Sequence, residues 1–312
     1  QIVVVGGVRR SAMISLSNLS DDRMRHAKSG QWWETAPHRA LANNSVSYTE
    51  KPDIETFMRE WTALVESKSG ERGIFNREAS KAQAAKYGRR DPDWQFGTNP
   101  CSEIILRPYQ FCNLTEVVVR ATDTIKDLER KVKLATILGT IQSSYTKFPY
   151  LRKVWQRNTE EERLLGVSLT GIMDNPLMTS VNSKLAGVLD ELRNVAVATN
   201  IEYAELLDIP QSAAITCVKP SGTVSQLVDS SSGIHARHSP YYIRTVRGDN
   251  KDPLTQFMID NGVPNEPCVF KSDSTTVFSF PVKAPERSTT RNDMTAIEQL
   301  ETWIMYQRYW CE

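Results

Sequence analysis

Short apolar runs alternate with amphipathic segments along most of this chain, and that alternation constrains its fold more than any other feature. Apolar side chains recur at the spacing of a helix face in four segments: 54–68, 125–142, 183–207 and 292–309. Further elements are expected at these positions: a helix from Asn158 or Thr159 through Met173, and strands at 2–5 and 213–218. Helices of this length between strands indicate parallel strands. The predicted fold class is therefore α/β, with 1–312 forming a single domain.

The composition limits the kinds of partner that the chain can bind. Of 312 residues, 38 are Lys or Arg and 37 are Asp or Glu, which gives a net charge of +1. No basic excess therefore marks a nucleic-acid or membrane surface. No apolar run reaches the length of a transmembrane helix. We expect a small-molecule ligand, no nucleic acid and no membrane.

The five cysteines are an odd number, and their spacing contains neither a C-x-x-C pair nor a zinc pattern. This usage is typical of a reducing cytoplasm, in which thiols are redox-active rather than structural. We expect a cytoplasmic protein without a metal site. The chain opens within an apolar run and closes at the end of a helical segment, which we interpret as an internal fragment of a longer chain.

Asn99, Cys101 and Glu103 occupy every second position of the segment GTNPCSEI, residues 97–104. On an extended backbone this spacing points the three side chains to one side. A thiol can act as a one-electron or nucleophilic centre, a carboxylate can move a proton, and an amide can hold a hydroxyl group. Pro100 lacks a backbone donor and suits a turn. A buried, inert cysteine is the ordinary alternative, but this combination indicates a reaction centre.

The sequence around this segment resembles the active-site loop of the ribonucleotide reductases. The resemblance rests on a series of motifs in order: GGVRRSA at 6–12, ANNSV at 42–46, NPCSEI at 99–104, FCNL at 111–114, KPSGTVSQL at 219–227 and VFSFPVKAPE at 277–286. It is greatest for the adenosylcobalamin-dependent class, class II. The resemblance implies a partial ten-stranded α/β barrel of the ribonucleotide reductase and glycyl-radical-enzyme type. A central finger loop, about 97–116, would carry Cys101. Family members have more sequence at both ends, in keeping with an internal fragment of the catalytic chain.

The resemblance also implies the reaction, which is reduction of ribonucleotides to 2′-deoxyribonucleotides for DNA synthesis through a thiyl radical. Cys101 would be the thiyl radical, Glu103 the general base for the 3′-hydroxyl proton, and Asn99 a ligand of the ribose hydroxyls. Cys112 would be one half of the redox-active disulfide, whose partner is absent from this chain. The radical source would be adenosylcobalamin, whose pocket the region at about 249–312 would help to form.

A turn rich in glycine and hydroxyl groups follows the expected strand at 213–218. Strand, turn and helix in this order form an anion site when N–H groups and hydroxyls face the ligand. The alternative is that Ser221 or Thr223 only caps the helix. By resemblance this is the substrate-phosphate loop, 219–227. The expected phosphate-binding residues are Ser221, Gly222, Thr223, Val224 and Ser225.

The expected partners are those of a reductase. They are a ribonucleoside diphosphate or triphosphate substrate, deoxynucleotide and ATP effectors that bind mostly outside this chain, and a thioredoxin-type reductant. Two alternatives remain open. Cys101 could be the nucleophile of a transferase, which requires a base such as His235 close to the thiol. The chain could also be a non-catalytic, nucleotide-binding fragment of a split reductase. As a fragment it is expected to be inactive on its own.

Overall fold

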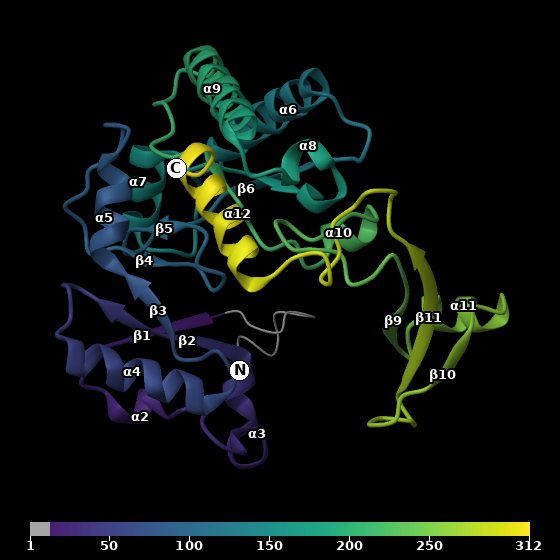
Figure 1. Cartoon of the computed structure of the whole chain (residues 1–312). Coiled ribbons are helices and arrows are strands. Elements are labelled where there is room, and N and C mark those ends of the chain that lie inside the picture. The colour runs from purple at the N-terminus through teal and green to yellow at the C-terminus, as the bar shows by residue number, and fades with distance from the viewer. Residues whose placement is uncertain (1–12) are drawn as a thin grey trace.

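The structure is a computed structural model that describes residues 13–312 of the chain (Figure 1). Two parallel three-stranded sheets form its body. The first has the strand order β1 (Met13–Ser17), β2 (Ala42–Tyr48), β3 (Gly73–Asn76). The second has the order β6 (Leu114–Val118), β7 (Gly166–Thr170), β8 (Thr216–Cys217). The strand expected at 2–5 and the motif at 6–12 lie outside the described residues.

Helices connect the strands of each sheet, as parallel pairing requires. The longer ones are α4 (Ile54–Ser67) in the first sheet and α6 (Ile125–Ser143), α7 (Lys153–Glu162) and α9 (Ser183–Leu206) in the second. The shorter connecting helices are α2 (Asp22–Arg25), α3 (Trp32–Thr35), η1 (Pro37–Leu41), η2 (Ile172–Asp174) and α8 (Pro176–Thr179). Two other short helices follow the last strand of each sheet: α5 (Arg77–Ala85) comes after β3, and α10 (Val224–Leu227) comes after β8. Side chains cap the long helices: Asp53 accepts from the Thr56 N–H, and Thr124 forms a capping box with Asp127. The helices predicted at 54–68, 125–142 and 183–207 are confirmed.

The helix expected to run from 158 or 159 through 173 is wrong. Helix α7 ends at Glu162, and the residues that follow it form β7, the central strand of the second sheet. All five residues of β7 are buried, as in a strand that is covered on both faces. Periodicity cannot separate such a short apolar run from a turn of buried helix. The strand predicted at 213–218 is present but shorter, as β8.

The main core lies between the second parallel sheet and the helices α6, α9 and α12 (Ala296–Tyr309). Leu128 of α6 and Leu189 of α9 are fully buried there. Trp310, just after α12, is also fully buried and donates its indole N–H to the Cys217 carbonyl at 2.7 Å. This contact anchors α12 to β8. The helix predicted at 292–309 is therefore confirmed, with its start at Ala296.

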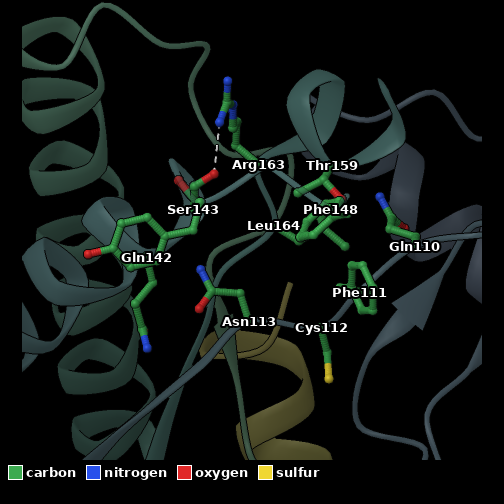
Figure 2. A pocket seen from close by; sticks show the side chains of 11 residues that line it. Gln110, Phe111, Cys112, Asn113, Gln142, Ser143, Phe148, Thr159, Arg163 and Leu164 are labelled. Carbon is green, nitrogen blue, oxygen red and sulfur yellow. Dashed lines mark hydrogen bonds between the residues drawn. The ribbon is translucent and has the colours of Figure 1, made fainter. Parts of the chain in front are cut away.

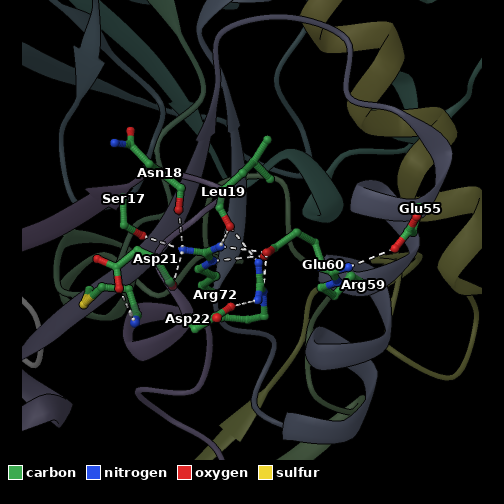
Figure 3. A network of polar contacts seen from close by, with 11 residues as sticks. Ser17, Asn18, Leu19, Asp21, Asp22, Glu55, Arg59, Glu60 and Arg72 are labelled. Atoms are coloured by element: carbon green, nitrogen blue, oxygen red, sulfur yellow. Dashed lines mark hydrogen bonds and ion pairs between the residues drawn. The ribbon is translucent and has the colours of Figure 1, made fainter.

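A buried ion cluster ties α4 to the first parallel sheet (Figure 3). Glu60, whose side chain is only 5% exposed, accepts hydrogen bonds from Arg25 Nε at 2.5 Å and Arg72 Nη2 at 2.7 Å. Arg72 also donates to the Ser17 hydroxyl at the end of β1 and to the Asn18 carbonyl. Burial alone would raise the pKa of Glu60, but the hydrogen bonds and charges of the two arginines outweigh it and lower that pKa. The carboxylate is thus held ionised between two guanidinium groups.

An antiparallel sheet extends away from this body (Figure 1). Its strand order is β10 (Asn265–Pro267), β11 (Thr275–Lys283), β9 (Tyr241–Asp249), and α11 (Pro253–Asp260) connects β9 to β10. The sequence patterns did not indicate this sheet. Its strand β9 ends where the region 249–312 begins, β10 and β11 lie in the first part of that region, and α12 at its end returns to the body.

A short antiparallel hairpin, β4 (Gly97–Thr98) with β5 (Ile105–Leu106), lies between the two parallel sheets (Figure 1). A methyl group added to Gly97 would lie 3.8 Å from Leu16 of β1, and one added to Gly166 of β7 would lie 3.2 Å from Ile104 of the hairpin. The hairpin therefore packs against both sheets. Two parallel sheets around a central loop are a partial α/β barrel, which confirms the predicted fold class. Within residues 13–312 the sheets do not close into a full barrel.

Candidate active site

The predicted reaction centre forms the tip of this hairpin. The pairs Gly97↔Leu106 and Thr98↔Ile105 leave residues 99–104 as the connection. The Ser102 N–H donates to the Asn99 carbonyl at 2.9 Å, and Ser102 has a left-handed φ of 64°, so the chain reverses sharply at Cys101. Cys101 is consequently exposed at the tip, whereas Asn99 is buried in the base of the turn.

Glu103 lies beneath the tip with its side chain only 4% exposed. Its Oε1 accepts from Asn99 Nδ2 at 2.6 Å and from Lys219 Nζ at 2.7 Å. Its Oε2 is buried and has no hydrogen-bond partner among residues 13–312. One carboxylate oxygen is thus fixed by two donors, and the other is a buried acceptor that no described residue satisfies.

Asn99 has both ends of its amide engaged within the hairpin. Its Nδ2 donates to Glu103, and its Oδ1 accepts from the Ile104 N–H at 3.1 Å. Asn43 of β2 adds a brace from outside by donating to the Pro100 carbonyl at 2.5 Å. The structure therefore brings the predicted residues Asn99 and Glu103 together, with the amide of Asn99 turned toward the carboxylate.

Lys219 is a residue of this site that sequence reasoning missed. Burial would lower the pKa of its ammonium group, but the hydrogen bond and charge of Glu103 outweigh that effect, aided by the nearby thiols of Cys101 and Cys112, so the pKa of Lys219 is raised. The one indication in the sequence was that Lys219 directly follows the apolar strand predicted at 213–218. A cation that is partly buried beside such a strand needs an anion as its partner. Nothing in the sequence indicates which anion it is.

A cavity of about 700 Å³ opens beside the hairpin tip, and we call it the Cys101 cavity. Its wall comes from the hairpin, α5, the segment after β8, and α12, and includes Cys101, Glu103, Pro220, His235, Trp303 and Cys311. An exposed thiol and a buried carboxylate with one unpaired oxygen thus share one cavity.

Cys112 lines a second cavity of about 220 Å³, which we call the Cys112 cavity (Figure 2). Phe111 forms one wall, with its ring 5.0 Å from that of Phe148 and 4.7 Å from that of Trp155. Arg163, which also lines this cavity, donates to the Ser143 carbonyl at 2.8 Å. The two candidate thiols therefore lie on different cavities, although both are close enough to Lys219 to act on its charge.

The other cysteines lie deeper. Burial raises the pKa of Cys217 well above its usual value, with a further contribution from Cys311. Burial likewise raises the pKa of Cys311 to about 12. None of the five cysteines forms a disulfide within the described part of the chain. These two thiols remain protonated at neutral pH and so are poor nucleophiles.

The expected phosphate loop is a turn between β8 and the short helix α10. Ser221 Oγ accepts from the Ser225 N–H at 3.0 Å, and Ser225 Oγ donates to the Ser221 carbonyl at 2.7 Å; both side chains are buried. Gly222, Thr223 and Val224 are exposed instead. The sequence pattern could not show which members of the loop turn inward, because that depends on these local hydrogen bonds.

His235 was the base required for a nucleophilic role of Cys101. Its ring lines the Cys101 cavity, but its Nδ1 lies 3.0 Å from the Ser232 carbonyl. No hydrogen bond between His235 and Cys101 occurs among the residues that the structure covers. The same residues contain no cluster of three His, Cys, Asp or Glu side chains able to hold a metal ion.

Known proteins are similar to nearly the whole of this chain, and they belong to the class that the sequence motifs resemble. No protein-family model matches the sequence. Adenosylcobalamin-dependent ribonucleoside-triphosphate reductases are 29% identical in Euglena gracilis and 30% identical in Lacticaseibacillus paracasei, each over 99% of this chain. The crystal structure of a B12-dependent (class II) ribonucleotide reductase superposes with a TM-score of 0.78 and 25% identity over 96% of the chain. Over nearly its whole length, this chain is similar to the adenosylcobalamin-dependent ribonucleotide reductases.

The chain spans less than half of these reductases. It covers 42% of the Euglena gracilis protein, 44% of the Lacticaseibacillus paracasei protein and 45% of the crystallised class II reductase. Ribonucleotide reductases are oxidoreductases, and the resemblance predicted from the motifs is confirmed. Over residues 13–312, no helix is both long and apolar enough to cross a membrane.

Proposed function

We propose that the protein reduces ribonucleotides to 2′-deoxyribonucleotides with adenosylcobalamin as cofactor, and that 1–312 supplies the catalytic thiol as a single domain. The observation that carries this proposal is the hairpin tip. It presents Cys101 to a cavity, and Glu103 lies in the same wall with one unpaired, buried oxygen. The similarity of nearly all of this chain to part of the class II reductases supports the same conclusion.

The reaction requires two kinds of chemistry within one site. A thiyl radical at Cys101 would take the 3′ hydrogen atom of the ribose, forming an S–H bond and leaving the radical on carbon. Glu103 Oε2 would accept the proton of the 3′-hydroxyl group, while the 2′-hydroxyl takes a proton from one thiol of the reducing dithiol and leaves as water. Asn99 would act mainly by holding Glu103, since its amide is bonded to that side chain. For Asn99 to bind the ribose hydroxyls as expected, its amide would have to give up the hydrogen bond to Glu103 or the one from the Ile104 N–H.

The reduction must also balance its electrons. A dithiol that becomes a disulfide gives up two electrons and two protons, and these convert the ribonucleotide to a deoxyribonucleotide and water. We propose Cys112 as one of these thiols, with its partner supplied from outside this chain. A thioredoxin-type protein would then reduce the disulfide. The separate Cys112 cavity is consistent with a thiol that reacts in a later step than Cys101.

Adenosylcobalamin, when bound, supplies the radical that the side chains cannot generate. The residues present fit a cofactor beside the thiol, because Cys101 is exposed and α12 presents large apolar side chains, including Trp303, at the same cavity. Within the region 249–312, we therefore propose that α12 holds the cofactor. The outlying sheet is a less suitable part of that region, because it extends away from the body.

We propose a ribonucleoside triphosphate as the substrate, following the names of the relatives. Its phosphates would meet the exposed residues Gly222, Thr223 and Val224, while Ser221 and Ser225 hold the loop in shape. Pro220 lines the Cys101 cavity, so the loop begins at the site of the thiol. Deoxynucleotide and ATP effectors and a cytoplasmic location complete the proposal.

The test compares wild type with Cys101→Ser in the full-length natural protein. Purified protein is assayed for deoxynucleotide formation with adenosylcobalamin and dithiothreitol, and nucleotide binding is measured by calorimetry. We expect the variant to lose reduction while its Kd for nucleotide stays within a few fold. Reduction by the variant near the wild-type rate would exclude Cys101 as the radical centre. Thiol-transfer activity without nucleotide reduction in the wild type would favour the nucleophile interpretation.

A further inference from the structure

Lys219 connects three parts of the site that are far apart in the sequence. Its backbone N–H donates to the Ser168 hydroxyl of β7 at 2.8 Å, which fixes the start of the phosphate loop on the central strand. Its ammonium group donates to Glu103 Oε1 at 2.7 Å, which fixes the carboxylate of the hairpin. The residue that follows it, Pro220, lines the Cys101 cavity. One residue, through its backbone N–H and its side chain, therefore links the second sheet, the loop and the reaction centre.

We propose that Lys219 is a positioning residue for proton transfer: its ammonium group occupies Glu103 Oε1, so that the ionised Oε2 is presented to the substrate hydroxyl. This inference rests on the proposed function of the site.

The division of the two carboxylate oxygens supports this role. A carboxylate can accept several hydrogen bonds on each oxygen. Here both donors, Lys219 and Asn99, bind Oε1, and Oε2 has no partner within 13–312 although it is buried. A buried acceptor without a partner is costly to keep. A ligand hydroxyl that donates a hydrogen bond to Oε2 would remove this cost.

The charges around Lys219 support it as well. The groups that face its ammonium are Glu103 on the hairpin and the thiols of Cys101 and Cys112. The side chain of Lys219 is 22% exposed and that of Glu103 is 4% exposed. The attraction between their charges is therefore weakened less by water than it would be at the surface. Lys219 remains protonated throughout. In the proposed step, the O–H bond of the substrate breaks and one forms at Oε2, and no proton moves to or from the lysine.

The first test measures activity in the full-length natural protein with Lys219→Met and Lys219→Arg. We expect Lys219→Met to lower kcat by about 10- to 100-fold, less than the loss of a general base can cost, with KM nearly unchanged. The pH dependence of kcat should also change, because the proposed proton acceptor loses a cation within hydrogen-bond distance. Lys219→Arg, which keeps the charge, should restore most of kcat and the wild-type pH profile.

Lys131 offers a matched control. It forms a similar ion pair with Asp123 and is 25% exposed, but it lies on α6 and lines neither the Cys101 nor the Cys112 cavity. Lys131→Met should leave kcat and the pH profile unchanged. Wild-type kcat and pH profile in Lys219→Met would overturn the inference. So would equal losses of kcat in Lys219→Met and Lys131→Met.

A second test does not depend on catalysis. In the full-length natural protein labelled with carbon-13 at the lysine ε position, the NMR titration of Lys219 is followed in wild type and Glu103→Gln, and assigned with Lys219→Arg. The pKa of Lys219 should fall in Glu103→Gln, because burial then acts without the carboxylate that opposes it. An unchanged pKa would overturn the ion pair. If the wild-type protein reduces no nucleotide, the proposed function fails, and this titration still decides whether Lys219 holds Glu103.

Discussion

Gly166, the first residue of β7, lies where three elements of the site meet. A methyl group at this position would approach Leu114 Cδ2 of β6 at 2.4 Å, and Cys217 Sγ of β8 and Ile104 Cδ1 of the hairpin at 3.2 Å each. The first distance is impossible without movement, but Leu114 is half-buried and can rotate. The other two neighbours are buried and must shift by a few tenths of an ångström.

These contacts give a magnitude for Gly166→Ala. Overpacking of a core by one methyl group costs about 1–3 kcal/mol. Replacement of glycine also restricts the unfolded chain, which offsets the cost by about 0.5–1 kcal/mol. We expect the free energy of unfolding to fall by about 0.5–2 kcal/mol. Urea unfolding of the 312-residue chain, followed by circular dichroism, measures this difference.

Gly187 of α9 is the matched control, because a methyl group there meets nothing within 4 Å and the residue is exposed. Gly187→Ala should raise the free energy of unfolding by about 0.5–1 kcal/mol through helix propensity. The two alanine variants should therefore change stability in opposite directions. If Gly166→Ala were as stable as Gly187→Ala, the crowding between β6, β8 and the hairpin would be disproved.

Two further predictions concern charge and redox chemistry. Glu60→Gln leaves Arg25 and Arg72 buried without their carboxylate, so the free energy of unfolding at pH 7 should fall by about 3–5 kcal/mol. These arginines lower the pKa of Glu60 in the folded state, so the ionised carboxylate contributes its full stability above the usual pKa of 4.5. That stability is lost as the pH falls through the folded-state pKa. Urea titrations at a series of pH values should therefore show the free energies of unfolding of wild type and variant converging in acid. Cys112→Ser in the full-length protein should still allow radical formation at Cys101, seen by electron paramagnetic resonance, but should stop turnover. Loss of that radical signal would show that Cys112 is not merely the reductant.

Local patterns in the sequence were enough to predict the long helices. In α6 and α9, apolar side chains such as Leu128 and Leu189 recur at helical spacing and are buried as that spacing requires. In β7 the same method failed, because a strand buried on both faces has no alternation to detect. The outlying sheet of β9 and β11 was also missed, although its 9-residue strands pair along their whole length.

In the candidate site too, local patterns predicted some of the residues and missed others. The spacing of Asn99, Cys101 and Glu103 predicted one reaction centre, and the hairpin brings them to one place. The pairing of Glu103 with Lys219 joins residues 116 positions apart and could not be read from either segment alone. The inward turn of Ser221 likewise depends on hydrogen bonds that form only after the loop has folded.

The position of Cys101 depends on both halves of the structure. On one side, Gly97 of the hairpin faces Leu16 of β1, and Asn43 of β2 holds the Pro100 carbonyl. On the other side, the hairpin packs on β7, and its Glu103 carboxylate accepts a hydrogen bond from Lys219, two residues after β8. A hairpin with such short strands is not stable by itself. Its geometry is therefore set by the two sheets, and a change in the packing of either one should alter the distance between the Cys101 thiol and the Glu103 carboxylate.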